Sequence, residues 1–594
     1  MTRSAVPPAE TTGPHAGGGA SRTWLRAMEQ AAALTADPGF VLADLLDRQG
    51  ETHGDRPALI GETGALTYAG LAARSRQYTR WALAEGLGHG DRVALLAANG
   101  PDYLAFWAGV SRAGVIVGLV NTNLRGDALK HGLAVSEPKR IVADPALFDA
   151  AAAVLADTGG LRRLGGGDLD PEAFSGAPLG KAGFFPAGRD DTALHIFTSG
   201  TTGLPKAARI SHGRILSWIG WFAGLMDPQP QDRLYACLPM YHSVGGITGV
   251  GAMLAAGGSV LLREKFSATR FWPDLVAGGC TLAQYTGELW RYLLAAPPHA
   301  DERRHNLRLI CGNGLREEVW TAAQDRFAIP GVLEFYAATE GVFSLFNVEG
   351  RPGAIGRIPP FLRHRAPAVL VRYDAETGAP VRGADGACVP CGPDEVGEAL
   401  GRVEGRKAGA AAFEGYTDAR ASEAKLLRDV FAPGDLWFRT GDLMRKDKAG
   451  FFYFVDRVGD TFRWKGENAS TREIADILAR APGVTQAAVY GVTVPGAEGR
   501  AGMAALCPGP GFTLEALADH AVRHLPAHAA PVFLRLMDRL PTTETFKVKA
   551  QALAAEGFDP ALPDPLYWFD PAARAYRPLD AAAYATIMAG AARL

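Results

Sequence analysis

The sequence predicts an α/β protein with a large N-terminal domain of parallel and mixed sheets flanked by helices, a β-rich subdomain, and a smaller α+β domain at the C-terminus. Three observations lead to this prediction. The chain of 594 residues is too long for one hydrophobic core. Strand-like segments alternate with helical segments in its first half, which is typical of βαβ units. From about residue 365, short strands punctuated by turn residues replace that alternation.

The large domain is predicted over 23–457, after an arm over 1–22 that we expect to be disordered. The arm is rich in Pro, Gly, Thr and Ala and contains no apolar stretch of the kind that a signal peptide needs. Residues 157–190 are predicted to be a long loop. The first predicted elements are helices over 40–51, 68–86 and 101–114 and strands over 55–60, 65–68, 92–97, 140–143, 193–197 and 232–238.

The smaller domain is predicted over 458–594. The β-rich subdomain precedes it, and turn residues separate its short strands. In the smaller domain, apolar residues at helical spacing alternate with strand-like runs. The predicted elements are strands over 368–373, 397–401 and 450–455, then a helix over 471–481, strands over 484–492 and 502–507, and a helix over 513–524.

Charge and cysteine spacing argue against two kinds of ligand. The formal net charge of −2 gives no basis for nucleic acid binding. Cys388 and Cys391 form a closely spaced pair, but no second pair stands at the spacing of a zinc site. We therefore expect two ordinary thiols in a reducing cytoplasm.

The run over 244–262 contains no charged residue and is the segment to test as a membrane span. Its glycines, and the break at Gly257 and Gly258, favour a buried helix, a turn and a strand over 259–262. A peripheral contact with a membrane stays open.

A loop rich in Gly, Thr and Ser, FTSGTTGLPK over 197–206, follows the predicted strand over 193–197. Glycines let a backbone approach a ligand closely, and the N–H groups, hydroxyls and lysine suit the oxygens of a polyphosphate. The spacing is not that of the Walker loop. Pro205 also disfavours a direct continuation into a helix. The sequence therefore predicts a phosphate-binding loop of another type.

Two further segments are expected at the carboxyl edge of a parallel sheet, where open α/β sheets bind ligands. Gly312, Asn313 and Gly314 follow one predicted strand and offer an amide and open backbone to a purine edge. The next strand leads to 336–340. There Tyr336 offers a flat face for stacking, and Thr339 and Glu340 offer a hydroxyl and a carboxylate that suit Mg²⁺ on a phosphate.

Polar residues also mark the second half of the chain. Asp442, in RTGD over 439–442, is predicted to lie in a tight turn, where its carboxylate could accept two hydrogen bonds from a ribose diol. Near the C-terminus, Lys547 ends the Thr-rich loop PTTETFK.

These motifs, in this order, resemble those of the adenylate-forming superfamily, which includes acyl-CoA synthetases, peptide-synthetase adenylation domains and luciferases. The similarity extends from about residue 40 to the end of the chain. Within the superfamily, the chain most resembles the fatty acid transport protein and very-long-chain acyl-CoA synthetase group. The strings that carry this resemblance are LVNTNLR at 119–125, CGNGLR at 311–316, EFY at 334–336, VDRVGDTFRWKGEN at 455–468 and TFK at 545–547.

The resemblance implies two successive reactions with ATP, CoA and Mg²⁺. A carboxylate attacks the α-phosphate of ATP to give acyl-AMP and pyrophosphate, and the CoA thiol then displaces AMP. Lysine and Mg²⁺ would neutralise the charge that develops on oxygen. By their positions in the matching motifs, the residues that would bind the β- and γ-phosphates are Thr198, Ser199, Gly200, Thr201, Thr202, Gly203 and Lys206. Those that would bind the adenine are Gly312, Asn313, Gly314 and Tyr336.

The same resemblance gives roles to the remaining candidates. Thr339 would contact phosphate, Glu340 would bind Mg²⁺, and Asp442 and Arg457 would hold the ribose. Lys547 would bridge the incoming carboxylate and the α-phosphate.

The last implied roles concern motion and the acyl and CoA sites. Gly459 would be the hinge of a mobile C-terminal domain, and Gly466 would let the pantetheine arm pass. His242 matches a position near the acyl carboxylate, where packing and gating are equally open to it. The family usually has Gly where this chain has Ala337, a methyl that could narrow the site or be absorbed.

The resulting prediction is an ATP-dependent long- or very-long-chain fatty acyl-CoA synthetase, cytoplasmic or peripheral on the inner face of the plasma membrane. One alternative keeps the chemistry with a bile-acid-like, steroid side-chain or carnitine-type acid. Another is a fatty acid carrier with a vestigial ligase site. A homodimer, the chain length of the acid and its saturation stay open.

Overall fold

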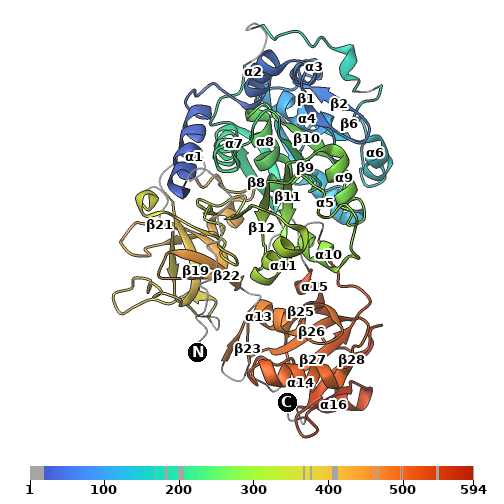
Figure 1. Ribbon diagram of the computed structural model, residues 1–594, viewed down its shortest axis with the longest axis vertical. Helices are drawn as coiled ribbons and strands as arrows, with labels where there is room; N and C mark the ends of the chain where they lie inside the picture. The colour runs from blue at the N-terminus through green and yellow to red at the C-terminus, as the bar shows by residue number, and fades with distance from the viewer. Residues whose placement is uncertain are drawn as a thin grey trace, which may run out of the picture. The chain divides into compact units, whose positions relative to one another are not determined.

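The computed structural model shows two compact units (Figure 1). The first comprises Met1–Pro367 and Arg402–Leu427, and the second comprises Ala368–Gly401 and Arg428–Leu594. The structure describes the chain except for residues 1–18, 168, 181–184, 199–205, 365–367, 375–376, 404–411, 459–460, 465–466, 496, 498, 544–547, 591 and 593.

A six-stranded sheet lies in the first unit. Its order is β6-β5-β3-β4-β7-β8, and all neighbouring strands are parallel except β7 and β8. The central strands are apolar and buried, as expected when both faces of a parallel sheet are covered. The strands are β3 (Arg92–Leu96), β4 (Ile116–Leu119), β5 (Arg140–Ala143), β6 (Leu161–Arg163), β7 (Thr192–Thr198) and β8 (Lys206–Ser211).

A second run of strands in this unit has the order β15-β14-β13-β12-β11-β9-β10-β1-β2. The strands from β13 to β1 are parallel to their neighbours, while β14, β15 and β2 are antiparallel to theirs. The strands are β1 (Pro57–Ile60), β2 (Ala65–Thr67), β9 (Arg233–Ala236), β10 (Ser259–Leu262), β11 (Leu282–Thr286), β12 (Leu309–Asn313), β13 (Val332–Ala337), β14 (Ser344–Asn347) and β15 (Gly356–Arg357).

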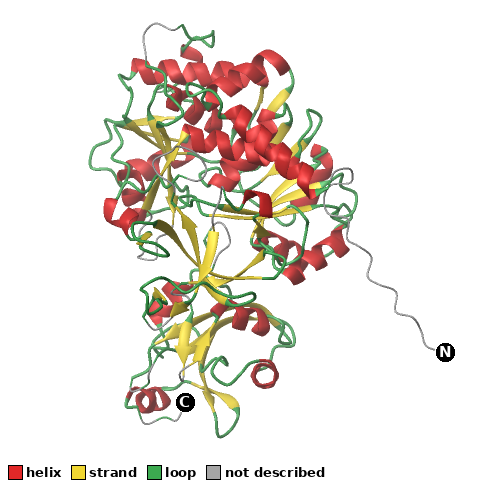
Figure 2. Cartoon of the chain, turned by 90° about the vertical axis from the view of Figure 1, so that its left-hand side faces the viewer, coloured by secondary structure: helices red, strands yellow, loops and turns green. Residues whose placement is uncertain are grey.

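Helices pack around these strands (Figure 2). Helices α4 and α7 are buried on nearly all sides, as expected for helices that are apolar around most of their circumference. The bounds are α2 (Leu42–His53), α3 (Tyr68–Ala84), α4 (Pro101–Arg112), α5 (Gly126–Ala134), α6 (Pro145–Ala152), η1 (Pro171–Ala173), α7 (His212–Met226), η2 (Val244–Thr248), α8 (Gly249–Ala255), α9 (Phe271–Gly278), α10 (Gly287–Ala295), α11 (Glu317–Phe327), η3 (Pro360–Leu362) and α12 (Ala419–Glu423).

Helix α1 (Ala20–Leu34) packs directly against α7. A Cβ atom added at Gly220 would lie 2.5 Å from the Cα of Ala31, and one added at Gly224 would lie 2.2 Å from the Cα of Ala27. Since those distances are far below contact distance, only glycine at both α7 positions permits this approach.

The second unit contains an antiparallel region and a separate five-stranded sheet. In the first region, β16 pairs with β19 and β21 pairs with β22. The strands are β16 (Ala368–Val371), β17 (Tyr373–Asp374), β18 (Ala379–Pro380), β19 (Val396–Arg402), β21 (Leu436–Lys446) and β22 (Phe451–Arg457), and β20 (Leu426–Arg428) lies at the boundary between the units.

The five-stranded sheet has the order β25-β26-β27-β28-β29 and its own apolar core. Ser470 begins α13 as an N-cap, with its side chain accepting from the backbone N–H of Glu473. The elements of this part are β23 (Phe462–Trp464), β24 (Glu467–Ala469), α13 (Thr471–Leu478), β25 (Val484–Val492), β26 (Ala501–Pro508), α14 (Leu514–His524), β27 (Phe533–Leu536), α15 (Ala550–Glu556), β28 (Leu566–Asp570), β29 (Ala575–Pro578) and α16 (Ala581–Met588).

The predicted α/β fold with a smaller α+β part is confirmed. The predicted loop over 157–190 is wrong in part, because Leu161–Arg163 pairs with β5 as an edge strand and Pro171–Ala173 forms a helical turn. The uncharged run over 244–262 forms η2, α8 and β10. Within the described part of the chain, no helix has both the length and the apolarity needed to cross a bilayer. The domain boundary after Arg457 stays a prediction.

Candidate active site

The predicted phosphate loop connects two antiparallel strands of the six-stranded sheet. Strand β7 ends at Thr198, β8 begins at Lys206, and these two residues are partners in the β-ladder. The prediction that the loop does not continue directly into a helix is confirmed. Ser199, Gly200, Thr201, Thr202 and Gly203 lie outside the described residues, so their phosphate contacts stay predictions.

The adenine and magnesium candidates follow two neighbouring parallel strands, β12 and β13. Gly312, Asn313 and Gly314 end the first, and Thr339 and Glu340 follow the second, so the sheet brings both segments to one edge. Gly312 leaves no room for a side chain, because an added Cβ would lie 2.1 Å from the carbonyl oxygen of Tyr285. Gly314 has φ +85°, a conformation that other residues rarely adopt.

Glu334 holds this glycine turn in place, and sequence reasoning did not assign it a role. Its side chain is fully buried, and its Oε1 accepts from the backbone N–H groups of Gly314 at 2.5 Å and Leu315 at 3.1 Å. The Tyr285 hydroxyl donates to Oε2 at 2.5 Å. Burial and the Glu334 charge raise the pKa of Tyr285 well above its usual value, so this hydroxyl keeps its proton. The available signal was one acidic residue inside the otherwise apolar strand VLEFYA.

Glu340 is hydrogen-bonded by Tyr416, a second residue that the sequence did not indicate. The Tyr416 hydroxyl donates to Oε1 of Glu340 at 2.6 Å, and both side chains are buried. The Thr198 side chain lies near the same tyrosine hydroxyl and acts to lower its pKa. Burial, followed by the Glu340 charge, raises the pKa of Tyr416 far above its ordinary value. One neutral hydroxyl thus donates to the candidate magnesium ligand.

The donor set around Glu340 fits a magnesium ion. Oε1 accepts the Tyr416 hydrogen bond and lies 3.9 Å from the Lys425 ammonium, whereas no described residue bonds Oε2. The described residues include no group of three or more His, Cys, Asp or Glu side chains arranged for a metal. Mg²⁺ commonly uses one or two carboxylates together with substrate phosphates and water, so a single free carboxylate oxygen suits it.

The candidate ribose residues lie in the second unit, on adjacent strands. Asp442 on β21 is the ladder partner of Arg457 on β22, and the Arg457 Nε lies 3.6 Å from the Asp442 carboxylate. The Asp442 side chain is 12% exposed and that of Arg457 is 48% exposed. A carboxylate in this position can accept from two hydroxyls while the guanidinium remains beside it.

The prediction that Asp442 lies in a tight turn is wrong. Leu436–Lys446 is one strand that passes through the RTGD segment. Gly441 takes φ +74°, and the backbone N–H of Asp442 donates to the Thr440 hydroxyl at 3.0 Å. Pairing with β22 on one side therefore outweighs the turn preference of Gly and Asp.

His242 and Tyr336 each lie beside an aromatic ring. The His242 ring is tilted against Tyr241 with centroids 4.7 Å apart, and its backbone begins the turn that leads into η2. Tyr336 has its ring 6.0 Å from that of Phe343. Ala337 is exposed at the end of β13, so its methyl group is not buried in the protein. The proposed roles of His242 and Tyr336 stay predictions.

Lys547, Gly459 and Gly466 lie outside the described residues, and their roles also stay predictions. Cys388 and Cys391 are described and are free thiols. Burial raises the pKa of Cys391 to about 11 and raises that of Cys388, so both thiols are protonated at neutral pH. A protonated thiol is a poor nucleophile, which agrees with the expectation of ordinary cysteines.

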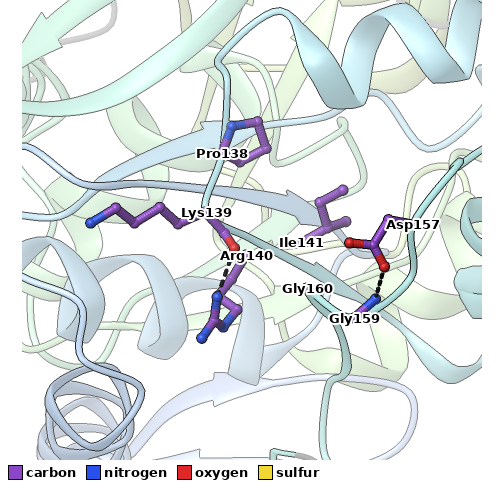
Figure 3. A pocket seen from close by; sticks show the side chains of 7 residues that line it. All are labelled: Pro138, Lys139, Arg140, Ile141, Asp157, Gly159 and Gly160. Atoms are coloured by element: carbon purple, nitrogen blue, oxygen red, sulfur yellow. Dashed lines mark hydrogen bonds between the residues drawn. The ribbon is translucent and has the colours of Figure 1, made fainter.

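A cavity of about 370 Å³ lies at the amino ends of β5 and β6 (Figure 3). Its polar groups already have partners. The Lys139 ammonium contacts Asp91 at 2.5 Å, and the Arg140 guanidinium contacts Glu85 at 2.6 Å. The lining residues are Pro138, Lys139, Arg140, Ile141, Asp157, Gly159 and Gly160.

Comparison with known families gives two matches that together cover most of the chain. The AMP-binding enzyme family matches residues 46–399, and the AMP-binding enzyme C-terminal domain matches 473–547. Among curated proteins, long-chain fatty acid transport protein 1 of Mus musculus is 39% identical over 90% of this chain and 85% of its own length. Long-chain fatty acid transport protein 3 of Homo sapiens is 42% identical over 86% of this chain and 76% of its own length.

Solved structures share the fold. ATP-bound MatB from Rhodopseudomonas palustris is 25% identical, with a TM-score of 0.74 over 86% of this chain and 98% of its own. The anthranilate CoA ligase AuaEII in complex with anthranoyl-AMP is 19% identical, with a TM-score of 0.74 over 87% of this chain and 97% of its own. The second likeness supports the fold only.

Proposed function

Because the chain belongs to the AMP-binding enzyme family and is related to the fatty acid transport proteins, we propose that its substrate is a long- or very-long-chain fatty acid. The chain is an adenylate-forming acyl-CoA ligase. The names of the similar proteins from Mus musculus and Homo sapiens support a long-chain acid. The observation that carries the proposed chemistry is the hydrogen bond from the Tyr416 hydroxyl to Glu340 at 2.6 Å, because it fixes the orientation of the candidate metal ligand.

The reaction that we propose needs positioning and charge neutralisation rather than a nucleophilic side chain. A carboxylate oxygen of the fatty acid bonds to the α-phosphorus of ATP, and the bond to pyrophosphate breaks. The CoA sulfur then bonds to the acyl carbon, and AMP leaves with the electron pair. Lys206 would contribute positive charge at the phosphates, and the edge of β12 and β13 would receive the adenine.

Glu340 would hold Mg²⁺ through its free oxygen. When bound, the ion would supply positive charge beside the phosphate oxygens. Thr339 would orient a phosphate with its hydroxyl, and Asp442 and Arg457 would bind the ribose. These assignments rest on donor chemistry and on the resemblance of the motifs to those of the adenylate-forming superfamily.

The function is tested by measuring pyrophosphate release from ATP with Mg²⁺ and a panel of carboxylic acids, each with and without CoA. We expect CoA-dependent turnover that is greatest with long-chain acids. A maximum with bile-acid-like, steroid side-chain or carnitine-type acids would replace the proposed substrate but keep the chemistry. The absence of release with every acid would favour a carrier with a vestigial ligase site.

Lys547 gives a second test, since we propose that it acts only in adenylation. Lys547→Ala should lower acyl-AMP formation about 10³-fold or more, while thioester formation from supplied acyl-AMP should stay within a few-fold of wild type. Lys549→Ala is the control, because Lys549 is a nearby exposed lysine. Equal loss of both steps would contradict the assignment.

Peripheral binding to the inner face of the plasma membrane and formation of a homodimer stay open. Co-sedimentation with anionic liposomes would test the first, and light scattering at several protein concentrations would test the second. Activity that remains entirely in the supernatant with liposomes would argue against a membrane contact.

A further inference from the structure

Arg214 lies in the first turn of α7 and contacts the loop that carries Thr339 and Glu340. Its side chain is fully buried. One terminal nitrogen donates to the carbonyl oxygens of Thr339 at 3.0 Å and Gly341 at 3.2 Å. The two carbonyls flank Glu340, so Arg214 grips the backbone on both sides of the candidate magnesium ligand.

The same guanidinium reaches a third segment, 412–416. Its other terminal nitrogen donates to the carbonyl oxygen of Ala412, and its Nε lies 3.4 Å from the Glu414 carboxylate. Glu414 is held from the other side by Ser211, whose backbone N–H and hydroxyl each donate to it at 2.7 Å. These contacts tie segment 412–416 to the start of α7.

Burying a guanidinium is unfavourable unless its donors are satisfied and its charge is balanced. Burial lowers the pKa of Arg214, while the Glu414 charge acts in the opposite direction. A planar fork can serve several acceptors in fixed directions, which a lysine ammonium cannot reproduce. The buried Arg214 guanidinium therefore costs free energy, and its hydrogen bonds hold α7, the 339–341 loop and segment 412–416 in place.

Segment 412–416 leads to Tyr416, which pairs with the strand next to the phosphate loop. Tyr416 forms a β-bridge with Ala208 on β8. The backbone N–H of Arg209 donates to Gly415 at 3.0 Å, and that of Thr417 donates to Ala207 at 2.9 Å. This pairing fixes the backbone from which the Tyr416 hydroxyl reaches Glu340.

A tyrosine hydroxyl has a specific advantage beside a metal ligand. It donates to one carboxylate oxygen of Glu340 at 2.6 Å without adding a positive charge, while the Lys425 ammonium stays 3.9 Å from that oxygen. Partners of this type orient a ligand, and their loss commonly lowers metal affinity by 10- to 100-fold.

We propose that Tyr416 and Arg214 are positioning residues for magnesium–nucleotide binding: Tyr416 orients the Glu340 carboxylate, and Arg214 holds the backbone of 339–341 against segment 412–416. This inference rests on the proposed function, because it takes Glu340 as the magnesium ligand. Neither residue contacts the reacting atoms in this scheme.

The test compares Tyr416→Phe with Tyr68→Phe. Each variant removes one buried hydroxyl, and the Tyr68 hydroxyl donates to the Gly258 carbonyl at 2.5 Å, away from the Glu340 contacts. Electron paramagnetic resonance would measure Mn²⁺ binding in the presence of a non-hydrolysable ATP analogue. We expect about tenfold weaker Mn²⁺ binding for Tyr416→Phe and wild-type binding for Tyr68→Phe. Affinity for the analogue without metal should not change.

Arg214→Lys keeps the positive charge and removes the planar fork, and Arg214→Gln removes the charge. Arg214→Lys should also weaken Mn²⁺ binding several-fold, with Arg214→Gln more severe. If Arg214→Gln does not fold, Arg214→Lys and Tyr416→Phe still decide the question. Unchanged Mn²⁺ binding in both of these variants would overturn the proposal, as would equal losses in Tyr416→Phe and Tyr68→Phe.

The binding measurement separates this inference from the proposed function. Wild-type protein that binds Mn²⁺ and the analogue but turns over no acid would contradict the synthetase while leaving the positioning roles testable. Wild-type protein that binds no metal with the analogue would overturn the positioning roles directly.

Discussion

Glu340 and Asp442 are both acidic residues that we propose as ligands, but the protein holds them in different ways. In the first unit, Glu340 follows a parallel strand and receives a short hydrogen bond from a neutral hydroxyl, that of Tyr416, with the Lys425 ammonium 3.9 Å away. In the second unit, Asp442 lies within an antiparallel ladder and has a guanidinium, that of Arg457, 3.6 Å away.

The difference corresponds to the ligand that each carboxylate is proposed to bind. A metal ligand needs its negative charge, so a neutral hydrogen-bond donor preserves its affinity for a cation. Ribose hydroxyls are neutral donors, and a carboxylate beside an arginine still has lone pairs to accept them. Both carboxylates have a cation within 4 Å, so the contrast lies in the short hydrogen bond from the neutral Tyr416 hydroxyl to Glu340.

The largest expected effect comes from neutralising the metal-binding carboxylate. Glu340→Gln keeps the shape of the side chain and removes its charge, so kcat/KM should fall about 10³-fold, or about 4 kcal/mol of transition-state stabilisation. Steady-state kinetics over a range of Mg²⁺ concentrations would measure it. Glu288→Gln, on α10 beside Arg291, is the control. Activity within threefold of wild type would exclude Glu340 as the metal ligand.

A buried ionisable group can also stay uncharged at neutral pH, as His195 on β7 does. It is 3% exposed and its Nδ1 lies 3.0 Å from the Ser136 hydroxyl. Burial lowers its pKa to about 4, with the Arg209 and Arg92 charges acting in the same direction.

The unfolded chain therefore binds more protons than the folded chain between about pH 6.5 and pH 4. The contribution of the uncharged His195 to the free energy of unfolding is fully present above pH 6.5 and falls by about 3 kcal/mol as the pH drops to 4. Denaturant unfolding at several pH values should show a flatter profile for His195→Gln than for wild type. Parallel profiles would contradict a neutral buried histidine.

Neutralising the proposed ribose ligand should have a smaller effect, concentrated in ATP binding. Asp442→Asn should raise the KM for ATP about 10- to 100-fold with little change in kcat, because a hydrogen bond to a charged acceptor contributes about 1.5–3 kcal/mol. Asp394→Asn is a matched control, since Asp394 pairs with Arg445 at 3.2 Å in the same unit. An unchanged KM would remove Asp442 from the ribose site.

The smallest effect is expected for the cation beside Asp442. Arg457 is nearly half exposed, and ion pairs of this kind contribute about 0–1 kcal/mol. Arg457→Gln should therefore raise the KM for ATP about threefold, and Arg445→Gln should leave it unchanged. A loss as large as that of Asp442→Asn would mean that Arg457 contacts the nucleotide more directly than this comparison implies.

Local sequence patterns predicted the elements well where the pattern and the pairing agree. The strand over 484–492 and the start of the helix at Tyr68 lie where apolar spacing placed them. The turn predicted for the RTGD segment is wrong, because Gly and Asp favour turns locally whereas long-range pairing with β22 keeps the segment in a strand. The short edge strand β6 was not predicted for the same reason: its three residues are in a strand because they pair with β5, which lies about 20 positions earlier in the sequence.

Motif residues of the candidate site could be proposed from the sequence because glycine, threonine and acidic residues follow strands in recognisable strings. Tyr416 and Arg214 were not found, because their partners are distant in sequence. Tyr416 and Glu340 are 76 positions apart, and Arg214 and Thr339 are 125 positions apart. Only the folded backbone shows that these side chains meet.

The contact between α1 and α7 affects where the enzyme can be shortened. The family match begins at residue 46, after α1, yet α1 packs closely against Gly220 and Gly224 of α7. Trp24 of α1 also packs edge-on against Trp221 of α7 and Phe346 of β14. A recombinant protein trimmed to the family boundary would expose these rings and bare glycine backbone to water, which favours aggregation. The physical boundary of the folded enzyme therefore lies upstream of the boundary that sequence families recognise.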